Sequence, residues 1–244
     1  MSTDAHTNLT VFPSPAVVDR DDWQQARDEL LVREKAHTRA GDALAAARRN
    51  LPMTPVAPAT LIGADGPVDL VDAFDGRRML IAYCFMWNHG KPHSHQCEGC
   101  TLSQAQIAPG VLPYLEARDV AYAVFSEGPY HELAAYRDFM GWPTHWYSTS
   151  KALDNPAVAG GGPLRCFLRD RDDVYLTYET DARGTEVLDT CLRLLDLTPY
   201  GRQETWEDAP TGVPQVPASS WWRQNGSPVA HRMIDSDTTT KTRA

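Results

Sequence analysis

MLIAYCFMW (residues 79–87), followed after a short gap by HSHQCEGC (residues 93–100), is the stretch that decides the predicted fold. The first part has the continuous apolar character of a strand that is buried on both faces of a sheet. The second part brings Cys97 and Cys100, spaced C-x-x-C, to the carboxyl edge of that sheet. Thiols with this spacing can close a reversible disulfide, or they can bind a soft metal ion together with nearby imidazoles.

The segments on either side predict an α/β domain built around this strand. Turn signals and apolar periodicity give this order along the chain: hairpin 60–70, strand 79–87, helical region 100–118 with an interruption at Pro109-Gly110, strand 120–125, helix 130–141, hairpin 164–178 and helix 184–197. Strand, helix, strand, helix, antiparallel hairpin and helix is the thioredoxin-type arrangement, here with an N-terminal hairpin added.

Two extensions flank this thioredoxin-like domain, which is expected to span residues 59–202. Residues 1–58 form an N-terminal arm and a long charged helix. Residues 203–244 form a Trp/Pro-rich C-terminal wrap that ends in a disordered tail. The wrap is expected to be ordered to about residue 232, because its three tryptophans are costly to leave in water.

The N-terminal helix is predicted to begin at Asp21 or Asp22, to end near Asn50 and to be divided at Gly41. Its apolar stripe is thin and rich in alanine, so it suits packing on the domain or on a second subunit better than building a core. We therefore expect a homodimer.

Charge and hydropathy exclude several classes of partner. The 244 residues carry a formal net charge of −9 and no long basic run, which disfavours nucleic acid as a partner. No apolar stretch approaches the roughly 20 residues that cross a bilayer, so no membrane association is expected. The first residues do not resemble a secretory signal, and a cytoplasmic location is the expectation.

The five cysteines fall into two groups. Cys84, Cys166 and Cys191 lie within apolar segments and are expected to be buried and inert. Cys97 and Cys100 lie among polar residues and glycine, and they are the reactive candidates. An odd number of cysteines in a chain expected in the cytoplasm does not suggest a disulfide framework.

Over about residues 22–210 the chain resembles the DUF899 family of thioredoxin-like proteins, which are described as predicted dithiol–disulfide oxidoreductases related to the peroxidase and thioredoxin superfamily. The motifs that carry the resemblance are Arg33-Glu34-Lys35, residues 97–101 (CEGCT), residues 137–142 (RDFMGW), residues 167–170 (FLRD), Ala182-Arg183-Gly184 and residues 195–202 (LDLTPYGR). The resemblance implies the same fold and a thiol or disulfide substrate, or a protein reductant.

Dithiol chemistry is the leading prediction, and it requires no cofactor. A C-x-x-C motif at a helix N-terminus leaves its first sulfur exposed to free N–H groups, so Cys97 would be the nucleophile and Cys100 the resolving thiol. Protonated His93 and His95 would favour the thiolate, while Glu98 would oppose it. The expected pKa of Cys97 is moderately lowered.

Two local features bear on this prediction. Pro163, directly before the strand at 164–168, occupies the place of the cis-proline that faces the disulfide in thioredoxin-like sites. The alternative is a trans-proline that ends the glycine-rich loop. Ser103-x-x-Gln106 can be read as a capping box. A helix that starts there would leave Cys100 in the loop and weaken the helix-dipole argument for Cys97.

The competing prediction is a metal site for copper, zinc or iron. His93, His95, Cys97 and Cys100, with His89 nearby, offer N and S donors within about a dozen residues. All of them lie on one loop, between residues 89 and 100.

A peroxiredoxin-like thiol peroxidase is a lesser alternative. Ser94 occupies the hydroxyl position of P-x-x-x-[T/S]-x-x-C relative to Cys97, but Gly90 stands where that motif has proline. Arg165 or Arg183 could supply the accompanying cation. A non-enzymatic interaction protein, in which C-x-x-C is only structural, also remains open.

A substrate pocket beside the thiols is the last expectation. The side chains proposed to line it are Trp87, Tyr175, Tyr178, Arg183, Glu186 and the tryptophans of the wrap.

Overall fold

The computed structural model describes residues 13–234, which form two compact units. One unit combines the described residues up to Ala43 with Leu192–Ser220. The other combines Leu44–Cys191 with the described residues from Trp221 onward, and it contains the sheet and both thiols of the C-x-x-C motif. No helix in the described part of the chain is long and apolar enough to span a bilayer.

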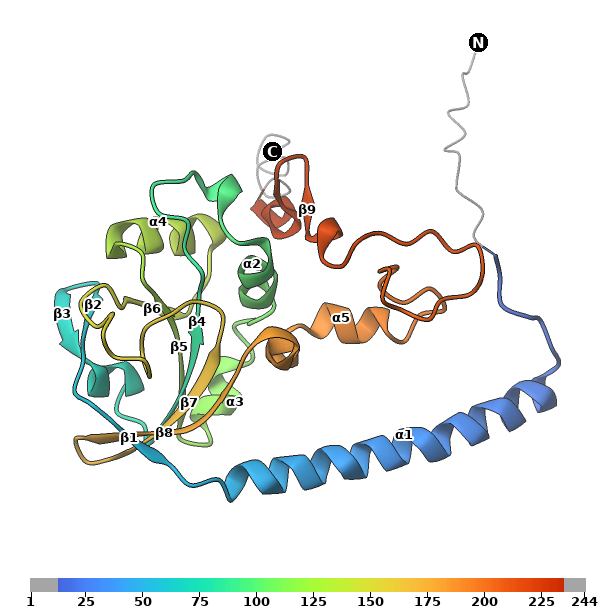
Figure 1. Cartoon of the computed structure of the whole chain (residues 1–244), viewed down its shortest axis with the longest axis horizontal. Coiled ribbons are helices and arrows are strands. Elements are labelled where there is room, and N and C mark those ends of the chain that lie inside the picture. The colour runs from blue at the N-terminus through green and yellow to red at the C-terminus, as the bar shows by residue number, and fades with distance from the viewer. Residues whose placement is uncertain (1–12, 235–244) are drawn as a thin grey trace, which may run out of the picture. The chain divides into compact units, whose positions relative to one another are not determined.

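A mixed sheet of eight strands forms the centre of the second unit (Figure 1). Its order is β1-β8-β7-β4-β5-β6-β2-β3. The strands are β1 (Thr54–Val56), β2 (Thr60–Gly63), β3 (Gly66–Asp69), β4 (Met79–Cys84), β5 (Val120–Ser126), β6 (His145–Ser148), β7 (Leu164–Asp170) and β8 (Asp173–Thr180). A separate small hairpin consists of β9 (Arg223–Gln224) and β10 (Ser227–Pro228).

Helices connect and flank these strands. The α-helices are α1 (Arg20–Arg49), α2 (Glu98–Ala105), α3 (Leu112–Glu116), α4 (Tyr130–Met140) and α5 (Thr190–Leu195). Short 3-10 turns are η1 (Leu70–Phe74), η2 (His93–His95), η3 (Ala182–Leu188), η4 (Ser220–Trp222) and η5 (Val229–His231).

The connections between the central strands identify the fold as thioredoxin-like. β4 and β5 are parallel neighbours, and the chain passes from one to the other through α2. After α4, β7 pairs antiparallel with β4, and β8 pairs antiparallel with β7. This is the predicted order of strand, helix, strand, helix and hairpin, and the hairpin β2–β3 is the predicted addition. The fold prediction is confirmed.

Several local predictions differ from the structure. The proline-rich linker contains β1, which extends the sheet beside β8, and the segment after Trp142 contains β6 beside β5. The predicted helix 184–197 is the 3-10 turn η3 followed by the short α5. Neither β1 nor β6 has enough residues for a period of two to stand out in the sequence.

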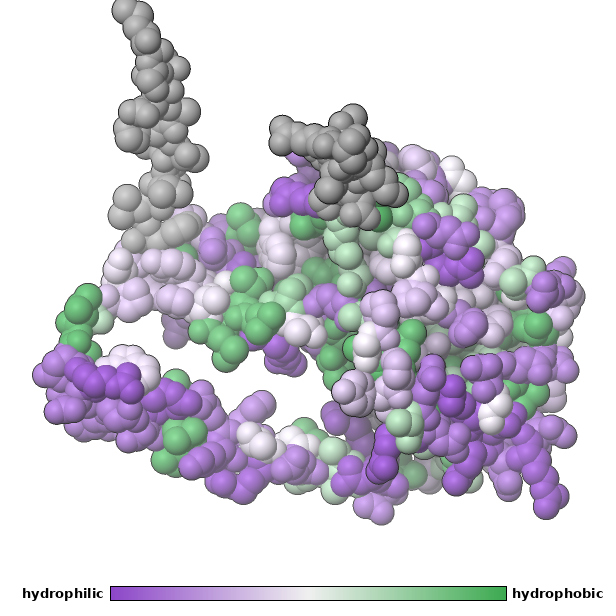
Figure 2. Space-filling view, turned by 180° about the vertical axis from the view of Figure 1, so that it is seen from behind, coloured by the Kyte–Doolittle hydropathy of each residue, from purple (hydrophilic) through white to green (hydrophobic). Residues whose placement is uncertain are grey.

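The long N-terminal helix is confirmed, but its start differs from the prediction. It begins at Arg20, because the Oδ1 atom of Asp19 accepts hydrogen bonds from the amides of Asp21 and Asp22 at 3.0 and 2.9 Å. It runs through Gly41 without a break, and none of its residues is buried. Hydrophilic residues dominate its visible face (Figure 2).

The C-terminal wrap does not form one piece. Its residues up to Ser220 belong to the unit that contains most of α1, while those from Trp221 belong to the unit that contains the sheet. Trp206 is half exposed. The arm at 1–12 and the tail from 235 lie outside the described residues.

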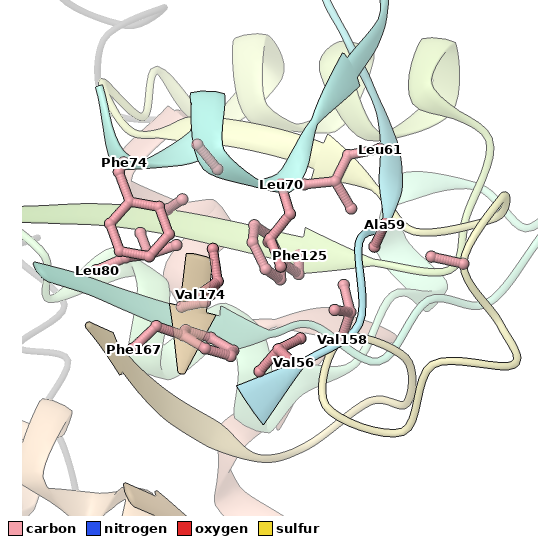
Figure 3. Packing of buried hydrophobic residues seen from close by; sticks show 14 of the residues in the cluster. Val56, Ala59, Leu61, Leu70, Phe74, Leu80, Phe125, Val158, Phe167 and Val174 are labelled. Atoms are coloured by element: carbon pink, nitrogen blue, oxygen red, sulfur yellow. The ribbon is translucent and has the colours of Figure 1, made fainter. Parts of the chain in front are cut away.

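Two hydrophobic clusters lie on opposite faces of the sheet, because successive side chains of a strand alternate between faces. Leu80, Ala82 and Cys84 of β4 belong to the first cluster, much of which is seen in Figure 3 around Phe125 and Phe167. Tyr83 and the following Phe85 belong to the second, together with Cys100, Tyr136 and Trp146. The C-x-x-C motif therefore packs on the face covered by α2 and α4.

Candidate dithiol site

The first thiol lies at the N-terminus of α2. Cys97 is the N-cap residue of this helix, with φ −59° and ψ 116°, and its Sγ atom accepts a hydrogen bond from the amide of Cys100 at 3.4 Å. The helix begins at Glu98, so the alternative start at Ser103 is wrong. A thiolate at Cys97 faces the free N–H groups and the positive end of the helix.

Hydrogen bonds favour the ionised form of Cys97. They lower its pKa from the usual 9.0 to about 7, first through the Cys100 thiol and then through the amides of Cys100 and Gly99. Partial burial and the neighbouring carboxylate of Glu98 oppose this effect. The predicted lowering of the pKa agrees with this result. Neither His93 nor His95 is among the largest influences on Cys97.

The second thiol is in the opposite state. Cys100 is 1% exposed, and its Sγ atom accepts a hydrogen bond from the amide of Met86 at 3.4 Å. The interaction with the Cys97 thiolate and burial both raise the pKa of Cys100 well above its usual value. The site thus pairs a partly exposed thiol whose pKa is lowered with a buried thiol whose pKa is raised.

A chain of buried polar groups leads from α2 into the core. The Oγ1 atom of Thr101 donates to the carbonyl oxygen of Cys97 at 2.7 Å and lies 2.8 Å from the hydroxyl of Tyr136. That hydroxyl lies 3.0 Å from Nε2 of His231, which comes from the C-terminal segment. The three side chains are buried, so each contact satisfies polar groups that water does not reach.

The long loop between β4 and α2 is held by two polar side chains. Glu132 of α4 accepts hydrogen bonds from Nε1 of Trp87 at 2.7 Å and from the amide of Gly90 at 3.2 Å. The fully buried amide side chain of Gln96 bonds to the backbone N–H and C=O of Asn88 and to the carbonyl of Lys91. These contacts give the loop from Phe85 to Cys97 a defined path to the start of α2.

The three histidines of this loop have separate surroundings. Nδ1 of His89 lies 3.2 Å from Glu132, the His93 ring packs on Tyr136 and Phe139, and Nδ1 of His95 lies 3.0 Å from the hydroxyl of Ser94. Within residues 13–234, no group of three or more His, Cys, Asp or Glu side chains is arranged to hold a metal ion. Copper, zinc or iron binding by His93, His95, Cys97 and Cys100 stays a prediction.

Pro163 precedes β7 and is a trans-proline. All peptide bonds of the described residues are trans, so of the two states that the sequence left open for Pro163, the structure has trans. The carbonyl of Pro163 accepts from the amide of Cys84 at 2.8 Å. Gly161 lies so close to Met86 that a Cβ atom would come within 2.9 Å of the Met86 Cα. The glycine-rich loop therefore packs against the residue that contacts Cys100.

The cations proposed for a peroxidase site are engaged elsewhere. The Nη1 atom of Arg165, which is buried, donates to Cys84 Sγ at 3.3 Å and to the carbonyl of Ala159 at 2.7 Å. Burial raises the pKa of this Cys84 thiol to about 11. Arg183 forms an ion pair with Glu186 at 2.8 Å.

The residues predicted to line a substrate pocket lie in different parts of the fold. Trp87 packs in the same cluster as Cys97. Tyr175 pairs with Pro55 and Leu168 within the sheet, and the ring of Tyr178 lies beneath the guanidinium of Arg48. The contacts of these two tyrosines of β8 are thus with β1, β7 and Arg48, and not with the thiols of the C-x-x-C motif.

The C-terminal segment supplies Arg223 and His231, for which the sequence predicted no role, and Trp222, one of the tryptophans predicted to lie beside the thiols. Arg223 bonds to three residues that flank Cys97, and His231 completes the polar chain from Thr101. Trp222 lies against Gly99, whose added Cβ atom would be 3.1 Å from the indole. Asn225-Gly226 between short strands is a hairpin signal that could have marked this segment, although not its destination.

Comparison with known proteins gives a family and remote structural similarities. The DUF899 family, described as bacterial protein of unknown function, matches residues 12–227. No curated protein matches the chain significantly.

Three solved structures illustrate the remote similarities. One is a Bacteroides thetaiotaomicron protein to which disulfide isomerase activity is ascribed (15% identity, TM-score 0.38, covering 58% of this chain and 91% of that one). Another is the peroxidoxin BcpB from Mycobacterium tuberculosis (15%, 0.39, 57% and 95%). The third is a Chlorobium tepidum protein to which the role of the thiol:disulfide interchange protein DsbE is ascribed (15%, 0.38, 59% and 98%). The fold assignment rests on the strand order, not on these values.

Proposed function

Since this chain belongs to the DUF899 family, whose description names no function, we propose from the geometry of its site that it is a thiol–disulfide oxidoreductase. Cys97 is the attacking thiolate and Cys100 the resolving thiol. The observation that carries the proposal is the asymmetry of the pair at the start of α2: a partly exposed thiol with a lowered pKa beside a buried thiol with a raised one.

The reaction proceeds in two exchanges. The Cys97 thiolate attacks one sulfur of a substrate disulfide, forms a mixed disulfide with it and expels the other sulfur as a thiolate, which takes a proton from solvent. Cys100 then loses its proton and attacks Cys97 Sγ. The Cys97–Cys100 disulfide forms and the second substrate thiol is released. The substrate gains two electrons and two protons, and an external thiol reductant returns the protein to the dithiol.

A reversible disulfide between Cys97 and Cys100 is the first expected result. After mild oxidation, the peptide that contains both residues should lose two hydrogen atoms and resist alkylation, and a reductant should restore both alkylation sites. Cys166, on β7, serves as an internal control and should be alkylated equally in both states after unfolding. Full alkylation of Cys97 and Cys100 after oxidation would contradict the proposal.

The pH dependence of Cys97 alkylation is the second expected result. Because the folded chain holds the pKa of Cys97 at about 7, below its usual 9.0, the alkylation rate should rise with pH to half its maximum near pH 7. In urea-unfolded protein the midpoint should move up toward pH 9.0, the usual value. Mass spectrometry of the alkylated peptide in a Cys100→Ala variant isolates Cys97. That variant lacks the Cys100 thiol, so its midpoint should lie between the two values. Equal midpoints in folded and unfolded protein would refute the assignment of Cys97.

The assembly and location of the protein remain predictions. A homodimer formed through α1 agrees with the exposed apolar side chains of that helix, which include Trp23, Leu30 and Leu44. A cytoplasmic location agrees with a dithiol that is kept reduced between turnovers.

A further inference from the structure

The guanidinium of Arg223 forms hydrogen bonds with residues that precede and follow Cys97 in the chain. Its Nη1 atom donates to the carbonyl oxygen of Ser94. Its Nη2 atom donates to the carbonyl oxygen of Gln96 at 2.8 Å and to Oε2 of Glu98 at 2.9 Å. One side chain thus binds residues on both sides of the attacking thiol, more than 120 positions earlier in the chain.

The segment that carries Arg223 is itself anchored. β9 and β10 form a hairpin across Asn225 and Gly226, which have φ values of 51° and 80°. Nη1 of Arg223 also donates to the carbonyl of Gly226 at 3.1 Å, which fixes the side chain on its own hairpin.

Both ends of this segment contact the dithiol helix. Before Arg223, the Trp222 indole lies against Gly99, inside the C-x-x-C motif. After it, His231 reaches Tyr136, whose hydroxyl contacts Thr101. Figure 1 shows β9 near the start of α2, in agreement with these contacts. Arg223 is therefore held over the loop from two sides.

We propose that Arg223 is a positioning residue for Cys97: it clamps the loop from Ser94 to Glu98 in the conformation in which Cys97 caps α2, and it neutralises the carboxylate next to the attacking sulfur. The proposal rests on the function proposed above. A planar guanidinium can serve two carbonyls and a carboxylate at once, whereas an ammonium group offers a single point charge. Glu98, left unpaired, would repel a thiolate at Cys97 and any anionic leaving group.

Four single variants, and the double variant that combines Arg223→Ala with Glu98→Gln, test the two parts of this role. Arg223→Ala removes the clamp and the charge, Arg223→Lys keeps the charge, and Glu98→Gln removes the carboxylate. Arg232→Ala is the matched control, because Arg232 lies on the same segment and its described hydrogen bond is to Gln224. Each is measured for Cys97 alkylation across pH, for disulfide exchange with a small aromatic disulfide, and for thermal unfolding.

Arg223→Ala should slow Cys97 alkylation at pH 7 by about fivefold, with its midpoint moved to higher pH. Arg223→Lys should have an alkylation midpoint close to that of the wild type, because the positive charge is kept. Its rate of disulfide exchange should stay low, since lysine cannot hold the carbonyls of both Ser94 and Gln96. In the Glu98→Gln background, the shift caused by Arg223→Ala should shrink, because no carboxylate remains to be neutralised. Arg232→Ala should have the wild-type midpoint of Cys97 alkylation and the wild-type rate of disulfide exchange.

An unchanged alkylation profile in Arg223→Ala, whatever its thermal stability, overturns the proposal. If that variant does not fold, an Arg223→Lys protein with a wild-type exchange rate overturns it equally. Failure of the proposed function has a different signature: no Cys97–Cys100 disulfide would form in the wild type, while the effect of Arg223 on alkylation would persist.

Discussion

Replacing Cys97 by serine is expected to reduce disulfide reduction by a factor of at least about a thousand, because a serine hydroxyl is not ionised near neutral pH and cannot form the mixed disulfide. Replacing Cys100 by serine should have a different result. Cys97 still attacks the substrate, but no second thiol lies behind it, so the mixed disulfide accumulates.

The measurement is turnover with a chromogenic disulfide, followed by mass spectrometry of the intact protein under non-reducing conditions. The Cys100→Ser protein should carry one substrate-derived adduct on Cys97, and the Cys97→Ser protein should carry none. Cys166→Ser is the matched control and should retain full turnover, because Cys166 lies on β7 and its pKa is raised by burial. An adduct that forms on Cys100 first would reverse the assigned roles.

Replacing Phe85 by alanine is expected to lower the free energy of unfolding by about 3–5 kcal/mol. Phe85 is 1% exposed, and its ring lies 5.1 Å from that of Trp146 and 6.0 Å from that of Tyr136, measured between centroids. Removing it leaves a cavity under the loop, in the cluster that also contains Cys100. The substitution should therefore change the reactivity of the thiols as well as the stability of the fold.

Urea unfolding followed by tryptophan fluorescence measures this loss. Tyr114→Ala, at a side chain that is 81% exposed on α3, removes a ring of similar size from the surface and should change the unfolding free energy by less than about 0.5 kcal/mol. Equal losses in the two variants would show that the second cluster is not a packed core. The Phe85→Ala protein should also show faster alkylation of Cys100, because the cavity opens the site to solvent.

Local sequence patterns were sufficient for much of the fold. The apolar run that became β4, the alternating signals of the β7–β8 hairpin and the charged periodicity of α1 each act within a dozen residues or so, which is the range over which periodicity and turn chemistry operate. The same holds for the C-x-x-C motif, whose spacing by itself places Cys97 and Cys100 on adjoining sites of one turn. Short strands such as β1 were missed, because three residues, of which Pro55 is the middle one, carry no periodic signal.

The sequence alone therefore determined the α/β class, the strand order around β4 and the two thiols. The C-x-x-C motif also predicted that Cys97 is the more exposed thiol and has the lower pKa, whereas the contacts that make the two thiols differ come only from the tertiary structure. Both thiols pack in the second cluster, which buries Cys100 completely and Cys97 only in part. The amide of Met86, the hydroxyl of Tyr136 and the guanidinium of Arg223 reach the site from distant parts of the chain. Contacts between residues so far apart leave no local pattern, since they arise only when the sheet has brought its edges and the C-terminal segment together.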